Sequence, residues 1–412
     1  MMESSIRFIH SADLHIDSLF KTKGYFPGEL LERLRQSTFE AFDRLIHACI
    51  ENKVDFLLIA GDLYNEEIRS IKAQVHLRRG FERLQEMDID VYISYGNHDY
   101  IEGKTLPITM PDNVHIFQSQ NVTHHPFEKN GEVLAHIYGF SYETREVRDR
   151  KVPFFTKGEG ADYHIGMLHG SLDTNTDHDV YAPFSLQELR SQELDYWALG
   201  HIHKRSVLST DPPALYPGNI QGRSRKESGE KGCYLVEHIS GEWNYHFVPL
   251  QSITYVSTTV GDLENTPSEE LERVLEKAKE EVAGGSPVML TITLVGYAGS
   301  IEDLQEWVEV VNENEDFDSD DWVWIEEIKT EARATWDEEE LMGGSHFTGE
   351  LLRTISELNE EEIEEWLSPL FNHRKVSKYI HPIKGEETAD VIEQTKTLLL
   401  ERMITHERRG AI

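Results

Sequence analysis

Short apolar runs alternate with helical spacing through the first 250 residues. Residues 29–52 and 68–87 carry apolar side chains three and four positions apart, which predicts two amphipathic helices. The predicted strands are residues 6–9, 54–60, 89–94, 163–168 and 194–199. Strands that alternate with helices in this way indicate an α/β domain built on a sheet.

A second part of the chain begins near residue 250. Predicted strands at residues 254–258 and 288–294 flank a predicted helix at residues 268–283, which suggests a small α/β module. From about residue 337 onward the pattern is helical and very acidic. We therefore expect three domains, with residues 1–250, 251–335 and 336–412.

The charge is spread unevenly over the 412 residues. The formal net charge is −35; residues 1–250 hold 26 basic and 37 acidic side chains, and residues 251–412 hold 14 and 38. The two parts therefore carry −11 and −24, from 26 − 37 and 14 − 38. This acidity argues against a surface that binds nucleic acid through charge alone.

Composition also limits the cellular setting. No run approaches the roughly 18 apolar residues of a membrane span, and the first ten residues lack the pattern of a signal peptide. The two cysteines, Cys49 and Cys233, form no CxxC motif, which excludes a disulfide framework and a cysteine-based zinc site. We expect a cytoplasmic protein with no membrane contact.

Five short polar motifs each follow a predicted strand. They are Asp13-Leu14-His15, Gly61-Asp62, Gly96-Asn97-His98-Asp99, His169-Gly170 and Gly200-His201-Ile202-His203. Taken singly they are weak, because DxH is common on surfaces, GD and GNHD form turns, and GHIH can be structural. Ligands of open α/β sheets bind outside the carboxyl ends of the strands, so we expect the five motifs to meet at one rim.

The motif residues offer the oxygen and imidazole donors of a metal site. The candidate ligands are Asp13, His15, Asp62, Asn97, His169, His201 and His203. Seven ligands exceed the needs of one tetrahedral ion but fit two divalent ions if Asp62 bridges them. Manganese, iron and zinc all suit such donors. Two metals about 4 Å apart are a common device for phosphoester hydrolysis, which leaves His98 to protonate the leaving oxygen or stabilise the transition state.

The ordered set DxH, GD, GNHD, H and GHxH resembles the calcineurin-like metallophosphoesterases. The local context resembles their DNA-repair nucleases of the SbcD and YhaO type; it comprises residues 8–15, 60–65, 94–99, 200–203 and 216–219. The resemblance implies a β-sandwich flanked by helices, with a smaller α/β cap domain and a helical C-terminal segment.

The resemblance also implies a role for each motif residue. One metal would be held by Asp13, His15, Asp62 and His203, and the second by Asp62, Asn97, His169 and His201. His98 would be the catalytic histidine, and Asp99 would either orient His98 or stabilise the turn. Manganese is the expected metal, with iron and zinc as alternatives.

One position departs from the resemblance. Some relatives have a histidine three residues after the bridging aspartate, where this chain has Asn65. Because asparagine cannot transfer a proton, exonuclease strength and polarity stay open, whereas metal binding is unaffected.

Nucleases of the SbcD type act with a coiled-coil ATPase of the SbcC type, which supplies DNA binding, and they commonly form homodimers. Residues 251–335 would correspond to the cap and residues 387–408 to a helix that docks on the ATPase. The simpler alternative for that helix is packing on its own domain. For direct DNA contact, Lys204 and Arg205 beside the GHIH motif are better candidates than the cluster at residues 223–226.

The sequence thus predicts a two-metal phosphodiesterase, a DNA exonuclease or endonuclease in repair, in which metal hydroxide attacks phosphorus. One alternative is a metallophosphoesterase acting on a small cyclic or protein phosphoester. A second is a scaffold for a partner ATPase, against which the complete ligand set argues.

Overall fold

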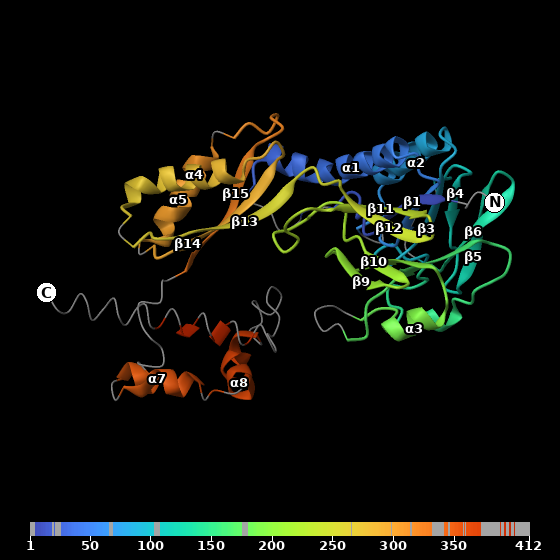
Figure 1. The fold of residues 1–412 in the computed structure, drawn as a ribbon. Coiled ribbons are helices and arrows are strands. Elements are labelled where there is room, and N and C mark those ends of the chain that lie inside the picture. The colour runs from blue at the N-terminus through green and yellow to red at the C-terminus, as the bar shows by residue number, and fades with distance from the viewer. Residues whose placement is uncertain are drawn as a thin grey trace. The chain divides into compact units, whose positions relative to one another are not determined.

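The chain divides into two compact units in a computed structural model (Figure 1). The first comprises residues 1–258, 273–291 and 308–327, and the second residues 259–272, 292–307 and 328–412. The structure describes residues 5–18, 20, 26–65, 69–102, 108–174, 180–264, 266–297, 299–313, 315–331, 342–344, 347–356, 358, 360–371, 388, 391–392, 395–396 and 399.

The first unit contains a six-stranded sheet of order β12-β11-β1-β2-β3-β4. Its strands are β1 (Ile6–Ser11), β2 (Phe56–Ala60), β3 (Asp90–Ser94), β4 (Val114–Ile116), β11 (Gly232–Ile239) and β12 (Glu242–Pro249). Strands β1 to β4 pair in parallel. Helices α1 (Gly28–Glu51) and α2 (Ile71–Gln85) make the crossovers from β1 to β2 and from β2 to β3 that parallel pairing requires.

A second six-stranded sheet has the order β5-β6-β7-β8-β10-β9. Its strands are β5 (Thr123–Lys129), β6 (Glu132–Gly139), β7 (Tyr163–His169), β8 (Tyr196–Gly200), β9 (Ser206–Thr210) and β10 (Pro213–Tyr216). Strands β6, β7, β8 and β10 pair in parallel, and β5 and β9 close the edges in antiparallel pairing. A short 3₁₀ helix, η1 (Val152–Phe154), and α3 (Leu186–Ser191) precede β7 and β8.

The two sheets pack face to face through alternate residues of their strands. Phe8 and Phe56 stack with ring centroids 5.0 Å apart, and they share one buried cluster with Ile165 and Met167 of β7. Their chain neighbours point to the other face, where Ile9 and Leu57 pack in a second buried cluster with α1 and α2. Both faces of β2 are therefore covered, which explains its uninterrupted apolar sequence.

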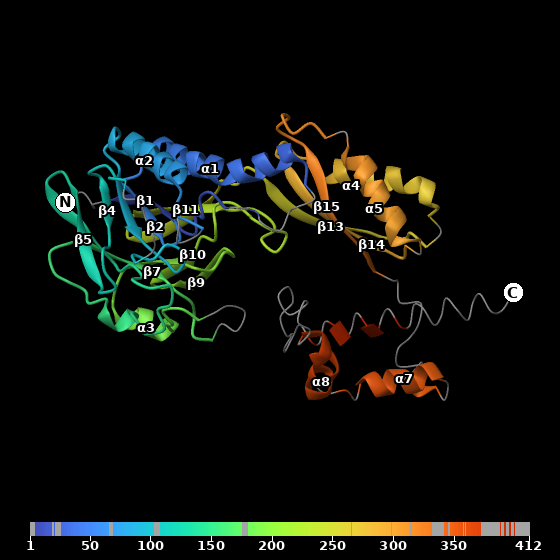
Figure 2. The ribbon, with the colours of Figure 1, turned by 180° about the vertical axis from the view of Figure 1, so that it is seen from behind.

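Helices cover both outer faces of this sandwich. Figures 1 and 2 show α1 and α2 along one side and α3 along the opposite side. On the α3 side, Leu189 shares a buried cluster with Trp197 and Leu199 of β8. The predicted α/β class, a β-sandwich flanked by helices, is confirmed.

The later part of the chain forms a three-stranded sheet and several helices. The sheet has the order β13-β14-β15, with β13 (Thr254–Val260), β14 (Val288–Val295) and β15 (Val323–Glu331). The helices are η2 (Ser268–Glu270), α4 (Leu271–Val282), α5 (Ile301–Asn312), α7 (Phe347–Ser356) and α8 (Glu360–Phe371). The expected boundaries at residues 250 and 335 stay a prediction, and most of the expected docking helix, residues 387–408, lies outside the described residues.

Among the described helices, none combines the length and the apolar character that crossing a bilayer requires.

Candidate metal centre

All five motifs lie at the carboxyl ends of parallel strands. β1, β2 and β3 end just before Asp13, Asp62 and Asn97 respectively, whereas His169 is the last residue of β7 and His201 follows β8 directly. Since β1 to β3 are parallel in one sheet and β7 and β8 in the other, the motifs gather at one edge of the sandwich.

One group of donor atoms comprises Asp13, His15 and His203. Their ligand atoms lie within 4.8 Å of one another. Nε2 of His15 lies 3.1 Å from Nε2 of His203, and the same His203 atom lies 3.8 Å from Oδ1 of Asp13. His15 and Asp13 are fully buried. Nδ1 of His15 is buried and has no hydrogen-bond partner in the described part of the chain.

A second group comprises Asp13, Asp62 and His169, again within 4.8 Å. Oδ2 of Asp62 lies 3.5 Å from Nε2 of His169, and Oδ1 of Asn97 lies 3.1 Å from that nitrogen. Asp62 also faces the first group, since its Oδ2 lies 3.8 Å from Nε2 of His15. Geometrically Asp13 belongs to both groups and Asp62 touches both, so the role of Asp62 as the bridge stays a prediction.

Outer contacts fix which nitrogen two of the histidines offer. Nδ1 of His169 donates to the carbonyl of Ala60 over 2.9 Å, and Nδ1 of His203 donates to Oε1 of Glu227 over 2.7 Å. A carbonyl or carboxylate oxygen only accepts, so each of these two histidines carries a proton on Nδ1 and presents Nε2 toward the aspartates, as a metal ligand must. Metal-binding histidines are held in this way, and the donor set fits two divalent ions.

His201 reaches the site partly through its backbone. Its N–H donates to both carboxylate oxygens of Asp13, over 3.2 and 3.0 Å, and its ring lies 5.2 Å from that of His169, centroid to centroid.

Several residues of the site have strained backbone conformations. The non-glycine residues with positive φ include Asp13 (51°), His15 (43°), Asp62 (53°) and His201 (101°). Such strained conformations persist where the surrounding structure enforces them, as at functional sites.

His98 lies beside the donor groups. Its backbone N–H donates to Oδ1 of Asp62 over 3.0 Å, and its ring centroid lies 5.1 Å from that of His15. Nδ1 of His98 donates to the carbonyl of Asn65 over 3.0 Å, which orients the ring and leaves Nε2 for chemistry.

Asp99 binds backbone amides of two turns. Its Oδ1 accepts from the N–H of Gly96 and its Oδ2 from the N–H of Leu63, each over 2.7 Å. These bonds tie the GNHD turn to the turn that carries Asp62. Of the two roles expected for Asp99, the turn-stabilising one matches these contacts.

Burial sets the protonation of the carboxylates. It raises the pKa of Asp13 to about 6 and, together with the charge of Asp62, the pKa of Asp99 to about 7. Burial also acts to raise the pKa of Asp62, but His169 and His15 outweigh it and hold that pKa well below its ordinary value. Two buried aspartates so close together call for compensating positive charge, which divalent cations would supply.

Three residues that support the site were not among its predicted ligands or catalytic residues, although Asn65 was noted as a departure from the resemblance. Glu227 holds His203, Asn65 holds the ring of His98 through its carbonyl, and Arg223 donates to Oδ1 of Asn65 over 2.5 Å. Neither Arg223 nor Glu227 belongs to a motif at a strand end. The sequence therefore identified Arg223 only as part of a basic cluster and gave no reason to select Glu227.

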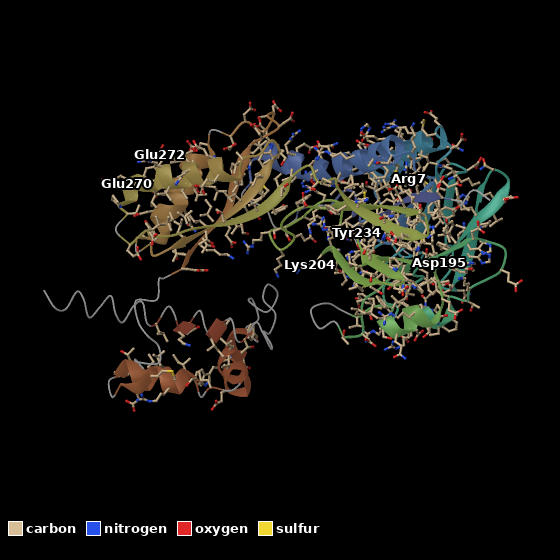
Figure 3. All side chains as sticks on the ribbon, in the orientation of Figure 1. Arg7, Asp195, Lys204, Tyr234, Glu270 and Glu272 are labelled. Carbon is tan, nitrogen blue, oxygen red and sulfur yellow. The ribbon has the colours of Figure 1, made fainter. Side chains whose placement is uncertain are left out.

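The two cations that the sequence favoured for DNA contact, Lys204 and Arg205, have different surroundings. The guanidinium of Arg205 lies over the ring of Phe247, 3.7 Å from its centroid, and 3.8 Å from Glu230. Lys204 is exposed in the turn before β9 (Figure 3). Their contact with DNA stays a prediction.

Comparison with known proteins agrees with this geometry. The model of the calcineurin-like phosphoesterase family matches residues 6–205. The chain is 37% identical over 406 residues to YhaO, an uncharacterised metallophosphoesterase of Bacillus subtilis, with 97% of this chain and 98% of that protein covered.

More distant similarities are partial. The chain is 28% identical over 242 residues to the DNA double-strand break repair protein Mre11 of Methanocaldococcus jannaschii, with 56% of this chain and 62% of that protein covered. A solved structure, GAP50 of the Plasmodium inner membrane complex, aligns with a TM-score of 0.37 and 12% identity over 60% of this chain and 85% of that one.

Proposed function

Because the chain belongs to the calcineurin-like metallophosphoesterases, whose members hydrolyse phosphoesters with divalent metals, we propose that it is a two-metal phosphodiesterase acting on DNA. The observation that carries the proposal is the position of His98. Its backbone binds Asp62, and its ring stands between the donor residue His15 and the carbonyl of Asn65. His98, a proton donor, therefore lies beside both groups of metal-ligand atoms.

Seven residues of the chain would hold the two metal ions. When bound, two divalent ions would acidify a water molecule and neutralise phosphate oxygens. The five side chains Asp13, His15, Asp62, His169 and His203 would hold them, with Asn97 and His201 completing the set.

His98 would serve the leaving oxygen. Because its Nδ1 proton is committed to Asn65, a second proton can only be held at Nε2. Burial lowers the pKa of His98, so that proton is given up more readily than by a histidine in water. The geometry suits donation to a departing alkoxide.

The choice of DNA as substrate is supported by the similarity to the Mre11 repair proteins and by the motif contexts of the SbcD type. The strongly acidic chain is a poor general DNA binder. The proposal therefore includes a coiled-coil ATPase partner, a cap formed by residues 251–335 and a docking segment at residues 387–408. It also includes manganese as the metal, a homodimer and a cytoplasmic location.

The test is hydrolysis of linear duplex DNA labelled at the 5′ or the 3′ end, by the full chain with manganese. His98→Ala should cut activity by about 10²- to 10⁴-fold while manganese binding is retained. His47→Ala, on the exposed face of α1, is the matched control and should leave the rate unchanged. The two labels report the polarity.

Two results would contradict the proposal in different ways. Equal activity of wild type and His98→Ala would remove His98 from the chemistry. Intact DNA together with cleavage of bis-p-nitrophenyl phosphate would contradict DNA cleavage by the chain alone and favour a small phosphoester, or a need for the partner ATPase.

A further inference from the structure

Arg223 lies in the segment between β10 and β11 and reaches the edge of the candidate metal centre. Its Nη1 donates to Oδ1 of Asn65 over 2.5 Å, and its Nη2 lies 3.4 Å from Oε1 of Glu227. The same Nη2 lies 3.3 Å from Nδ1 of His203. That nitrogen already donates its proton to Glu227, so it cannot accept from Arg223.

The guanidinium of Arg223 has more N–H groups than its contacts with Asn65 and Glu227 use. A guanidinium carries five N–H groups, of which one is directed to Asn65 and one to Glu227. Its Nε is buried and has no hydrogen-bond partner among the described residues. The side chain is 19% exposed, so it is accessible but largely held in place.

Asn65 links Arg223 to the catalytic histidine. The carbonyl of Asn65 accepts from Nδ1 of His98, and its side-chain oxygen accepts from Arg223. One residue therefore sets the position of both groups. The charge of Arg223 is also among the causes that lower the pKa of His98 and of His15, which places the cation within electrostatic reach of both rings.

Two neighbouring arginines are engaged elsewhere. Arg225 forms an ion pair with Glu327, and Arg205 covers the ring of Phe247. Unlike these two arginines, Arg223 directs its guanidinium toward His203 and lies within electrostatic reach of His98.

We propose that Arg223, held by Asn65, binds a phosphate oxygen of the substrate beside His98. A guanidinium fork matches the geometry of a phosphate, and its charge is permanent. In a chain of net charge −35, a fixed cation at the site would offset repulsion of an anionic substrate. The inference rests on the proposed phosphodiesterase function and adds a substrate-binding residue to it.

The experiment measures competition by inorganic phosphate and the KM for bis-p-nitrophenyl phosphate, with the full chain in manganese. Arg223→Gln should raise both the phosphate inhibition constant and KM by about 10- to 100-fold, the loss expected for a charge-assisted hydrogen bond. Arg223→Lys should recover part of that loss, since the charge returns without the fork. Arg148→Gln, which removes an exposed arginine paired with Glu146, is the matched control.

Manganese titration calorimetry on each variant separates substrate binding from damage to the metal centre. Manganese affinity should be unchanged in Arg223→Gln. If it falls, Asn65→Ala decides, because that variant keeps the backbone carbonyl for His98 and releases only the guanidinium. Asn65→Ala should raise the phosphate inhibition constant with manganese affinity intact.

An unchanged phosphate inhibition constant in Arg223→Gln with full manganese binding, or in Asn65→Ala, overturns the inference. Phosphate ion is a ligand of any phosphoesterase site. A phosphate effect in a chain that fails to cut DNA would therefore contradict DNA cleavage by the chain alone, while the role of Arg223 in binding phosphate would still hold.

Discussion

Glu227 is expected to tune metal affinity through His203. Its Oε1 accepts from Nδ1 of His203 over 2.7 Å, a length typical of a charge-assisted hydrogen bond. Burial acts to raise the pKa of Glu227, but the bond to His203 and the charge of Arg223 outweigh it and hold that pKa well below its ordinary value, so the residue is ionised. Glu227→Gln removes the charge with little change in shape.

The expected loss follows from the contacts of both carboxylate oxygens. Loss of a group that orients a ligand histidine typically weakens metal binding about 10- to 100-fold, which is about 1.4 to 2.8 kcal/mol. Oε2 accepts from the N–H of Arg223 over 2.7 Å and from Nδ2 of Asn219 over 3.0 Å. A carboxamide that keeps its oxygen toward His203 turns its NH₂ toward these donors, so folding stability should also fall by about 1 to 3 kcal/mol.

A double-mutant cycle distinguishes the two effects. Manganese affinity is measured by calorimetry for wild type, Glu227→Gln, His203→Ala and the double variant, and unfolding of the metal-free chains is followed by calorimetric melting. If Glu227 acts through His203, Glu227→Gln should add no further loss of affinity to His203→Ala. Glu146→Gln, at an exposed carboxylate, is the matched control.

This role of Glu227 would be refuted by equal manganese affinity of wild type and Glu227→Gln. It would fail equally if Glu227→Gln lowered affinity by the same factor with and without His203, since the effect would then run through general destabilisation.

Three further predictions concern stability and the close packing of the site. Chelation of divalent metal should lower the Tm, because metal at 100 times its Kd stabilises the fold by about 2.7 kcal/mol; an unchanged melting curve with EDTA would count against the metal centre. In Gly96→Ala, the new Cβ would lie 2.3 Å from Oδ1 of Asp62 and 2.6 Å from Nε2 of His169, so manganese affinity should fall at least about tenfold, with an unaltered circular dichroism spectrum as the control for folding. Burial lowers the pKa of His10 to about 3 from 6.5, so between these values the unfolded chain binds more protons, and stability should decrease as the pH is lowered, by up to about 1.4 kcal/mol per pH unit. Denaturant melts from pH 7 to 4 should show a shallower pH dependence for His10→Gln than for wild type, and parallel curves would exclude His10 as a source.

Regular secondary structure in the first 250 residues was predictable where the pattern of apolar residues matches the way the element is buried. The helix expected at residues 29–52 is α1 (Gly28–Glu51), and the strand expected at residues 54–60 is β2 (Phe56–Ala60). α1 buries one face and so places apolar residues three and four positions apart, whereas β2 is buried on both faces and so is apolar without interruption.

The edge strands were not predictable in the same way. β5 (Thr123–Lys129) contains two histidines, a proline and only one buried residue, Phe127. Its conformation is set by antiparallel pairing with β6, a contact that local composition does not announce.

The candidate ligands and the family could be inferred from the sequence alone, because each motif follows a strand and parallel strands end at one edge. The sequence also singled out His98, the proposed catalytic histidine, beside Asn97 in the same motif. These features depend on residue type and short spacing, which a linear chain displays directly.

Only the tertiary structure revealed what holds those residues. Glu227 lies 24 positions from His203, and Arg223 lies 158 positions from Asn65, yet each pair is joined by a hydrogen bond. Which carboxylate orients which imidazole, and which cation faces the site, depends on how the loops of two sheets converge. Hydrogen bonds form between neighbours in space, and no local pattern of side chains encodes that distance.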